Sequence, residues 1–206
     1  HPEVELWIGT FNTNRLDYVE KILDDTTLQA NVKGVGTQWE CRNNLPQMRQ
    51  RYPHLRFMCS ESECGNGSMD WAAGEHTFFL LSDNLGNGVD EYYNWNFILA
   101  DHGESPWGWR QNALIQVDSQ TRQPRYTAEY YAYKHFSHFV EPGTQMVAYA
   151  GREYSRTPIV VFRNAAGQHI VTAGNFTAEE CVVNVKIGHR YLNMVLPAHS
   201  FSTYVM

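Results

Sequence analysis

Two carboxylates follow a short apolar run in the first third of the chain. The run from Phe57 to Ser60 ends at Glu61, and Glu63 comes two residues later, just before a Gly/Asn turn. A buried parallel strand delivers a carboxylate to the mouth of a (β/α) barrel in this way. Side chains two residues apart on an extended strand point in the same direction, so both acids could face that mouth. The plainer interpretation is a pair of solvated loop acids, the ordinary place for Glu.

The chemistry that such a carboxylate would do is nucleophilic attack on a sugar. A glycosidase of this kind needs two carboxylates, one that attacks or activates water and one that protonates the leaving oxygen. Only Glu61 stands in a convincing position, because it ends the strand directly.

Composition excludes several other classes of function. The 206 residues are 43% hydrophobic and 18% charged, so a packed core is expected, and disorder is not. The net charge of −6 and the lack of any basic cluster disfavour nucleic acid and anionic membrane surfaces. No apolar run approaches the ~18 residues of a membrane span. Aromatic residues make up 14%, which suits either a sugar cleft or a core.

The cysteines and two short motifs give weaker signals. No zinc or disulfide framework matches the spacing of Cys41, Cys59, Cys64 and Cys181. Two N-glycosylation sequons begin at Asn66 and Asn175, and they would matter only in a eukaryotic secretory route.

Strand and helix patterns alternate through the first two thirds of the chain. Strands are predicted over 4–10, 32–39, 55–60 and 92–99, and helices over 16–25, 45–51, 69–85 and 127–139. This alternation predicts βαβ units and a parallel sheet. From residue 145 the pattern changes to short β-rich runs over 146–150, 158–163, 169–173, 181–187, 191–196 and 201–205. These predict an antiparallel β-sandwich.

The chain opens at His1 and enters an apolar strand almost at once. A natural domain rarely starts in the middle of its core, so we expect a processed chain or a fragment.

Several motifs of residues 57–143 together resemble glycoside hydrolase family 30, which includes glucosylceramidases, β-xylosidases and endo-glycanases. The motifs are Ser60-Glu61 with Cys64-Gly65-Asn66-Gly67, Tyr93-Asn94-Trp95-Asn96, Trp107-Gly108-Trp109-Arg110-Gln111-Asn112 and the stretch from Tyr130 to Pro142. The β-rich tail is similar to the β-domain of that family. The resemblance implies an α/β plus all-β chain: the second half of a (β/α)8 TIM barrel, strands five to eight, over residues 1–143, then a β-sandwich domain over 144–206.

The resemblance also implies a retaining mechanism. Glu61 matches the nucleophile at the end of barrel strand seven, and it would form a covalent glycosyl-enzyme. The acid/base Glu of the family follows an Asn at the end of strand four, and no Asn-Glu pair occurs in residues 1–206. We therefore expect the chain to need the missing N-terminal half of the barrel as a partner. Alone, it should be inactive and should dimerise or aggregate through open strand edges.

Further substrate-binding residues follow from the same resemblance. Gln38 and Trp39 end strand six, where groups contact the nucleophile or the sugar. Trp95 would form the floor of the sugar subsite and Asn96 could bond a hydroxyl. The alternative for Trp95 is a place in the barrel core. Trp109 lies in the loop after strand eight and could shape substrate entry.

No cofactor or metal is implied. His135 and His138 have a helical spacing that could suggest a metal ligand pair, but no third ligand stands at a matching offset. The segment 101–104 is more simply a solvated loop.

The leading hypothesis is a retaining β-glycosidase, acting on a β-xyloside or β-glucoside and secreted or periplasmic as the family resemblance implies. The alternative is a non-catalytic carbohydrate-binding or vestigial chain that uses the same aromatic residues.

Overall fold

The computed structural model describes residue 1 and residues 3–151 and 156–206. By internal contacts these residues form two compact units, each of which is described separately. The first unit combines His1–Cys64 with Asn87–Phe97, and the second combines Gly65–Gly86 with Ile98–Met206. The domain boundary predicted after residue 143 stays a prediction.

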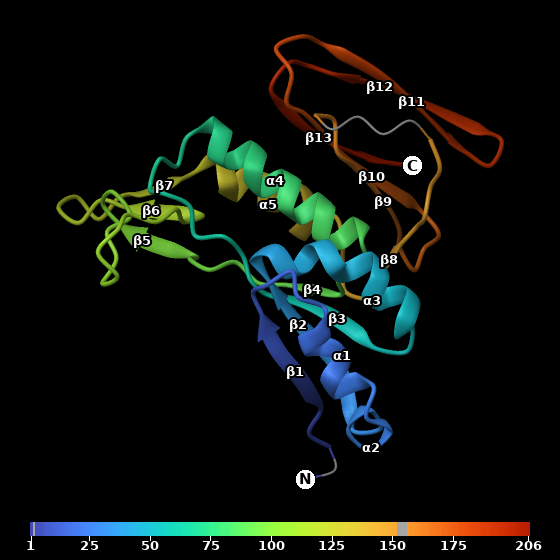
Figure 1. Ribbon diagram of the computed structural model, residues 1–206. Coiled ribbons are helices and arrows are strands. Elements are labelled where there is room, and N and C mark those ends of the chain that lie inside the picture. Colours follow the sequence, from blue (N-terminus) through green and yellow to red (C-terminus); the bar gives the residue numbers. More distant parts are fainter. Residues whose placement is uncertain (2, 152–155) are drawn as a thin grey trace. The chain divides into compact units, whose positions relative to one another are not determined.

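The first unit is built on a parallel sheet in strand order β1-β2-β3-β4 (Figure 1). Its strands are β1 (Leu6–Phe11), β2 (Val32–Gln38), β3 (Arg56–Glu61) and β4 (Glu91–Tyr92). Its helices are α1 (Asp17–Leu23), α2 (Thr26–Gln29), the 3-10 helix η1 (Trp39–Asn44) and α3 (Leu45–Arg51). The parallel sheet predicted from the alternating pattern is therefore confirmed, and α3 has the predicted bounds.

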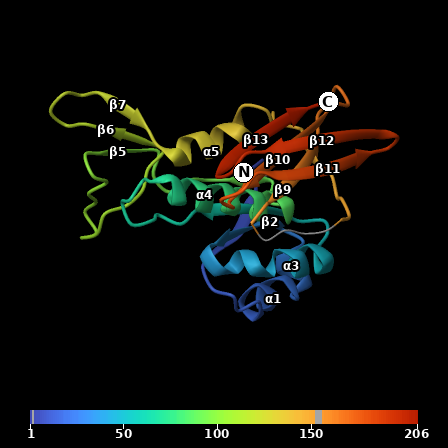
Figure 2. The same ribbon diagram turned by 90° about the horizontal axis from the view of Figure 1, so that it is seen from above.

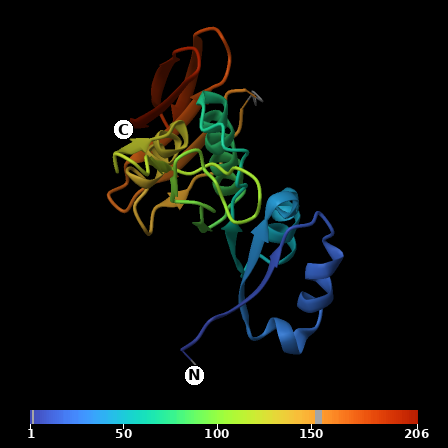
Figure 3. The same cartoon turned by 90° about the vertical axis from the view of Figure 1, so that its left-hand side faces the viewer.

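The core of this unit lies between the sheet and its helices, which cover one face of the strands (Figure 3). Val35 and Phe57 on the central strands are fully buried, and apolar residues of α1 and α3 pack against them. Burying such side chains is the main favourable term in folding. It fixes the central strands, and with them the residues at their carboxyl ends.

The predicted strand over 92–99 is wrong. The fourth strand of the sheet is only Glu91–Tyr92, and Ile98–Ala100 forms β5 in a different sheet. The chain leaves the sheet after β4 because Asn94 and Trp95 form hydrogen bonds with the side chain of Ser62 instead of continuing the strand pairing. The Ser62 hydroxyl donates to Asn94 Oδ1 at 2.9 Å and accepts from the Trp95 N–H at 3.0 Å.

The described residues of the second unit form two helices and three sheets. The helices α4 (Trp71–Gly86) and α5 (Ala128–Ser137) run side by side (Figure 1). A small sheet absent from the sequence predictions, visible in Figure 2, contains β5, β6 (Ile115–Val117) and β7 (Pro124–Tyr126). The remaining strands are β8 (Gln145–Met146), β9 (Ile159–Arg163), β10 (His169–Asn175), β11 (Cys181–Ile187), β12 (Arg190–Leu196) and β13 (Ser200–Val205).

The β-rich tail is antiparallel, as predicted. Strands β13-β10-β9-β8 form one sheet and the hairpin β11-β12 forms another. Val171 of the first sheet and Met194 of the second are both fully buried in one shared cluster. On the helix side, Phe78 of α4 stacks on Phe201 of β13 with ring centroids 4.8 Å apart. The four-stranded sheet thus packs against both the β11-β12 hairpin and the helix α4.

The close approach of α4 and α5 depends on Gly74. A Cβ at Gly74 would lie 2.6 Å from the Cβ of Ala128 and 3.0 Å from its backbone carbon, so the helices would have to separate. A Cβ at Gly86, in the same helix, would meet only Val160, at 3.8 Å.

We therefore expect Gly74→Ala to lower the free energy of unfolding, although alanine is the better helix former by about 1 kcal/mol. Overpacking costs about 1–3 kcal/mol, which outweighs that gain. Urea unfolding measures the difference. The matched control Gly86→Ala should be neutral or stabilising, and equal effects at the two glycines would contradict the close helix contact.

The two sequons differ in accessibility. Asn66 is exposed, whereas Asn175 has no exposed surface. The amide nitrogen of Asn175 donates to the carbonyl oxygens of Glu179, Leu196 and Pro197 at 2.8–3.0 Å. Asn175 is thus a structural residue in the folded chain. Among the described residues, no helix combines the length and the apolarity needed to cross a bilayer.

Candidate active site

Glu61 is the last residue of β3, at the carboxyl end of the parallel sheet. The pairing of β2 with β3 is irregular there. Thr37 pairs with Cys59 but Gln38 pairs with Glu61, so the register skips Ser60. Such an irregularity re-aims the side chains that follow it, and it is common beside active sites. Because of this shift, Glu61 lies opposite Gln38, which fits the contact with the nucleophile that the resemblance implied for the end of this strand. The irregular pairing itself was not predicted.

Both oxygens of the Glu61 carboxylate accept hydrogen bonds from the end of the neighbouring strand. Gln38 Nε2 donates to Oε2 and Trp39 Nε1 donates to Oε1, each at 3.3 Å. Two donors on different oxygens fix the plane of a carboxylate more firmly than one could. The structure thus brings together three of the predicted site residues.

Trp95 and Asn96 lie in the loop directly after β4, in the same unit. Ser62, the residue after Glu61, anchors this loop through the bonds to Asn94 and Trp95. Asn94 Nδ2 in turn donates to the carbonyl of Asn96 at 2.7 Å. Trp95 is 41% exposed in this chain, and its place in the sugar subsite or in the barrel core stays a prediction.

Trp109 belongs to the second unit, so its role beside Glu61 stays a prediction. It is half-exposed, in the loop between β5 and β6. Asn112 organises the turn at Gly65–Gly67, because its Oδ1 accepts from the Gly67 N–H at 2.7 Å. A Cβ at Gly65 would lie 2.4 Å from the Asn112 side chain, and φ there is +67°.

Sequence reasoning missed Arg42. It lies in η1, and its Nη1 contacts the carboxylate of Glu63 at 3.1 Å and the carbonyl of Trp39 at 3.0 Å. The only available signal was an Arg three residues after Trp39, which is too common a pattern to indicate a role. Glu63 is thus not a solvated loop acid, since Arg42 binds it.

Thiol chemistry is unfavourable at Cys59 and Cys41. Burial raises the pKa of Cys59 to about 12 and that of Cys41 to about 11. Both side chains therefore stay protonated at neutral pH, and a thiol is a poor nucleophile compared with a thiolate. All four cysteines are free thiols in the structure.

One buried carboxyl group in the second unit, that of Glu129, has a raised pKa. Glu129, in the first turn of α5, accepts from the Thr77 hydroxyl at 2.9 Å. Burial raises its pKa to about 7, against the opposing effects of hydrogen bonds from Thr77 and Asn112 and the nearby His76; Asp70 adds a small upward shift.

The His135/His138 pair does not form a metal site with neighbours. His135 Nδ1 bonds the hydroxyl of Thr203 at 2.9 Å, and burial lowers the pKa of His135. Within residues 1, 3–151 and 156–206, no three His, Cys, Asp or Glu side chains are grouped to hold a metal ion.

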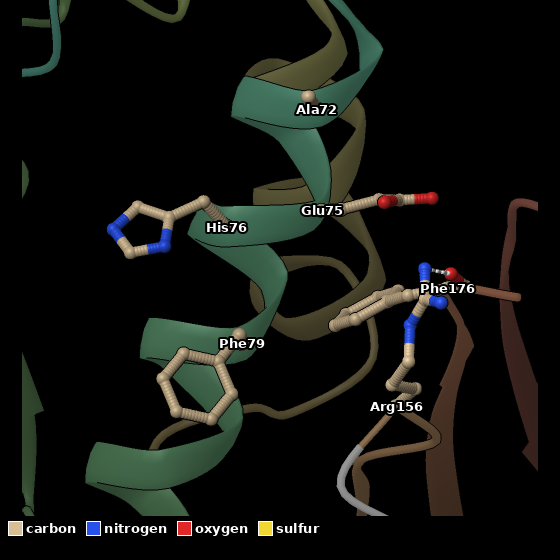
Figure 4. A pocket seen from close by; sticks show the side chains of 6 residues that line it. All are labelled: Ala72, Glu75, His76, Phe79, Arg156 and Phe176. Carbon is tan, nitrogen blue, oxygen red and sulfur yellow. Dashed lines mark hydrogen bonds between the residues drawn. The ribbon is translucent and has the colours of Figure 1, made fainter.

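A pocket of about 290 Å³ opens on the second unit beside α4, lined by Ala72, Glu75, His76, Phe79, Arg156 and Phe176 (Figure 4). Its polar groups do not converge. His76 points away from Glu75 and Arg156 in Figure 4. Glu75 binds His199 at 2.8 Å, and Arg156 donates to the carbonyl of Phe176. None of the predicted site residues lines this pocket, so the Glu61 cluster is the better candidate.

Comparison with curated proteins finds similar sequences among glucosylceramidases. The chain is 23% identical over 211 residues to the lysosomal acid glucosylceramidase of Mus musculus, which covers 91% of the chain and 39% of that protein. It is 26% identical over 158 residues to the putative glucosylceramidase 1 of Caenorhabditis elegans, covering 68% of the chain and 29% of that protein. The chain thus spans less than half the length of these relatives. No family model matches it.

Solved structures share the fold. SrfJ from Salmonella typhimurium superposes with a TM-score of 0.85 at 21% identity, covering 95% of this chain and 45% of that one. A GH30 endoxylanase from Clostridium papyrosolvens gives a TM-score of 0.74 at 14% identity, covering 98% and 56%. The parallel sheet and the antiparallel sheets therefore correspond to about half of each larger structure.

Proposed function

Because this chain is a relative of glycoside hydrolase family 30 in sequence and in fold, we propose that it forms the nucleophile-bearing half of a retaining β-glycosidase. The observation that carries the proposal is the Glu61 carboxylate, held at the end of β3 by Gln38 and Trp39 through one oxygen each. In this proposal the four parallel strands are strands five to eight of a (β/α)8 barrel.

The proposed reaction is a double displacement. Glu61 attacks the anomeric carbon, the bond to the leaving oxygen breaks, and a carboxylic acid protonates that oxygen. The resulting glycosyl ester is then hydrolysed by water that the same acid/base group deprotonates, so the configuration is retained. Gln38 and Trp39 orient the attacking oxygens throughout, which is how positioning lowers the barrier of such a step.

The acid/base must lie roughly 5–5.5 Å from the nucleophile in a retaining enzyme. Glu63 is engaged by Arg42 and is not assigned this role. We place the acid/base in the part of the barrel that the larger relatives have beyond the matched half. The substrate class is a β-xyloside or β-glucoside, and the proposed location is secreted or periplasmic.

Covalent labelling tests the proposal. A 2-deoxy-2-fluoro-β-glycosyl fluoride carries a leaving group that needs little acid assistance, and its 2-fluorine slows the second step, so the glycosyl-enzyme should accumulate. We expect the full-length protein that contains this chain to gain one sugar on the peptide that includes Glu61, detected by mass spectrometry. Comparing xylosyl and glucosyl reagents would identify the preferred sugar. A label on another carboxylate would refute the role of Glu61.

One observation favours the alternative of a non-catalytic carbohydrate-binding chain. Trp39 and Trp95 are 39% and 41% exposed, and exposed aromatic residues can stack on a sugar without any reaction. Saturable binding of an oligosaccharide by the full-length protein, with no label on any carboxylate, would support that alternative.

A further inference from the structure

Trp39 occupies a backbone conformation that is unfavourable for a bulky side chain. Its φ is +46°, in the left-handed region, where a non-glycine residue costs on the order of 1–3 kcal/mol. The conformation comes directly after β2 and starts η1. From this position the indole N–H reaches Glu61 Oε1. Other contacts must stabilise this strained turn. The strained conformation places the indole N–H on the carboxylate of the proposed nucleophile.

Arg42 is placed to hold that turn. Its Nη1 donates to the carbonyl oxygen of Trp39 at 3.0 Å, which fixes the peptide next to the strained residue. The same nitrogen lies 3.1 Å from Glu63 Oε1. The two side chains are only 20% and 24% exposed, so water screens the ion pair less than it would at an open surface.

The ion pair joins the two segments that carry the site. Arg42 follows β2 and Trp39, and Glu63 follows β3 and Glu61 by two residues. A contact between the two loops therefore sets the distance between the indole donor and the carboxylate acceptor.

We propose that Arg42 and Glu63 are positioning residues, which hold the Trp39 turn so that its indole N–H stays on Glu61. The proposal rests on the proposed role of Glu61 as the nucleophile. Misplacement of a reacting group by about 1 Å can lower the rate about 10²-fold, which sets the size of the effect to be sought.

The kinetic test uses the full-length protein with Arg42→Gln, Glu63→Gln and the double variant. We expect each single variant to lower kcat about 10- to 100-fold with KM nearly unchanged, since the pair orients the nucleophile and does not bind the sugar. The double variant should lose no more than the worse single one, because the two residues act as a unit. Arg42→Lys should recover part of the rate. The matched control is Arg51→Gln, which removes another Arg–carboxylate pair of the same unit.

A second measurement follows the turn directly. In the full-length protein labelled with 5-fluorotryptophan, the ¹⁹F resonance of Trp39 can be assigned as the one lost in Trp39→Phe. We expect Arg42→Gln and Glu63→Gln to move that resonance and Arg51→Gln to leave it in place. Rates and a Trp39 resonance equal to those of the control would overturn the proposal.

The proposed function and the positioning role can be refuted independently. If Glu61→Gln retains full activity, the proposed function is wrong, whatever the Arg42 variants do. If Glu61→Gln is inactive but the Arg42 and Glu63 variants match Arg51→Gln in both measurements, only the positioning role is wrong.

Discussion

Glu61→Gln should lower kcat/KM of the full-length protein by a factor on the order of 10⁴ or more, because removing an enzymic nucleophile has effects of that size. The amide keeps nearly the shape of the carboxylate, and its oxygen can still accept from Trp39. Its nitrogen cannot accept from Gln38, so one hydrogen bond is lost, at a cost in stability of about 1 kcal/mol. Hydrolysis of an aryl β-glycoside gives the rates, and urea unfolding shows whether the variant is still folded.

The matched control is Glu20→Gln. Glu20 is in the same unit and pairs with Arg51, so the variant also exchanges a paired carboxylate for an amide. It should leave kcat/KM within about twofold, as expected for a surface substitution. A further arm replaces Glu61 by glycine and adds azide, which should restore turnover and give the glycosyl azide of inverted configuration. Activity of Glu61→Gln close to that of the control would contradict the assignment.

The second large expected effect is a dependence of folding stability on pH that arises from Glu129. Its pKa is about 7 in the folded chain, against 4.5 for an ordinary Glu. Below about pH 4.5 both the folded and the unfolded chain hold this proton. As the pH rises from about 4.5 to 7, the unfolded chain releases it first, so this group lowers the stability by a total of about 3 kcal/mol. Above about pH 7 both states are ionised and the contribution is constant.

Glu129→Gln should remove that slope, because the amide does not ionise. The measurement is the free energy of unfolding from urea titrations at several pH values between 4.5 and 8, for the parent and the variant. All other groups are the same in the two proteins, so the difference between the two curves isolates the contribution of Glu129. Glu179→Gln, at an exposed glutamate, should follow the parent. Parallel curves for the parent and Glu129→Gln would contradict the raised pKa.

The order of elements could be predicted from the sequence because it depends on strong local patterns. Apolar runs ending at polar residues marked β2 and β3, and the bounds predicted for α3 and β11 are those observed. The prediction of the fourth strand failed although the aromatic run over 92–99 has a high strand propensity. The length of that strand depends on the contact of Asn94 with Ser62, which lies 32 residues away in the sequence. Strands of three residues, such as β6, carry no detectable period.

The site was predicted in its residues but not in its geometry. Glu61 was indicated by the end of its strand, whereas Gln38 and Trp39 were implied by the family resemblance. The irregular pairing at Ser60 and the positive φ of Trp39 decide how they meet, and both arise from contacts between strands that no local pattern records. Arg42 belongs to the same class of feature, since its partner Glu63 lies 21 residues further along the chain.

The burial of Asn175 has a consequence for producing the protein. An oligosaccharyltransferase in a eukaryotic expression host acts on the nascent chain, before β10 has paired, when Asn175 and Thr177 are still accessible. A glycan attached then would occupy the nitrogen that must donate to three carbonyl groups, and the bulky sugar could not enter a site with no exposed surface. Such a molecule would stay unfolded in its tail. Bacterial expression avoids this competition between modification and folding.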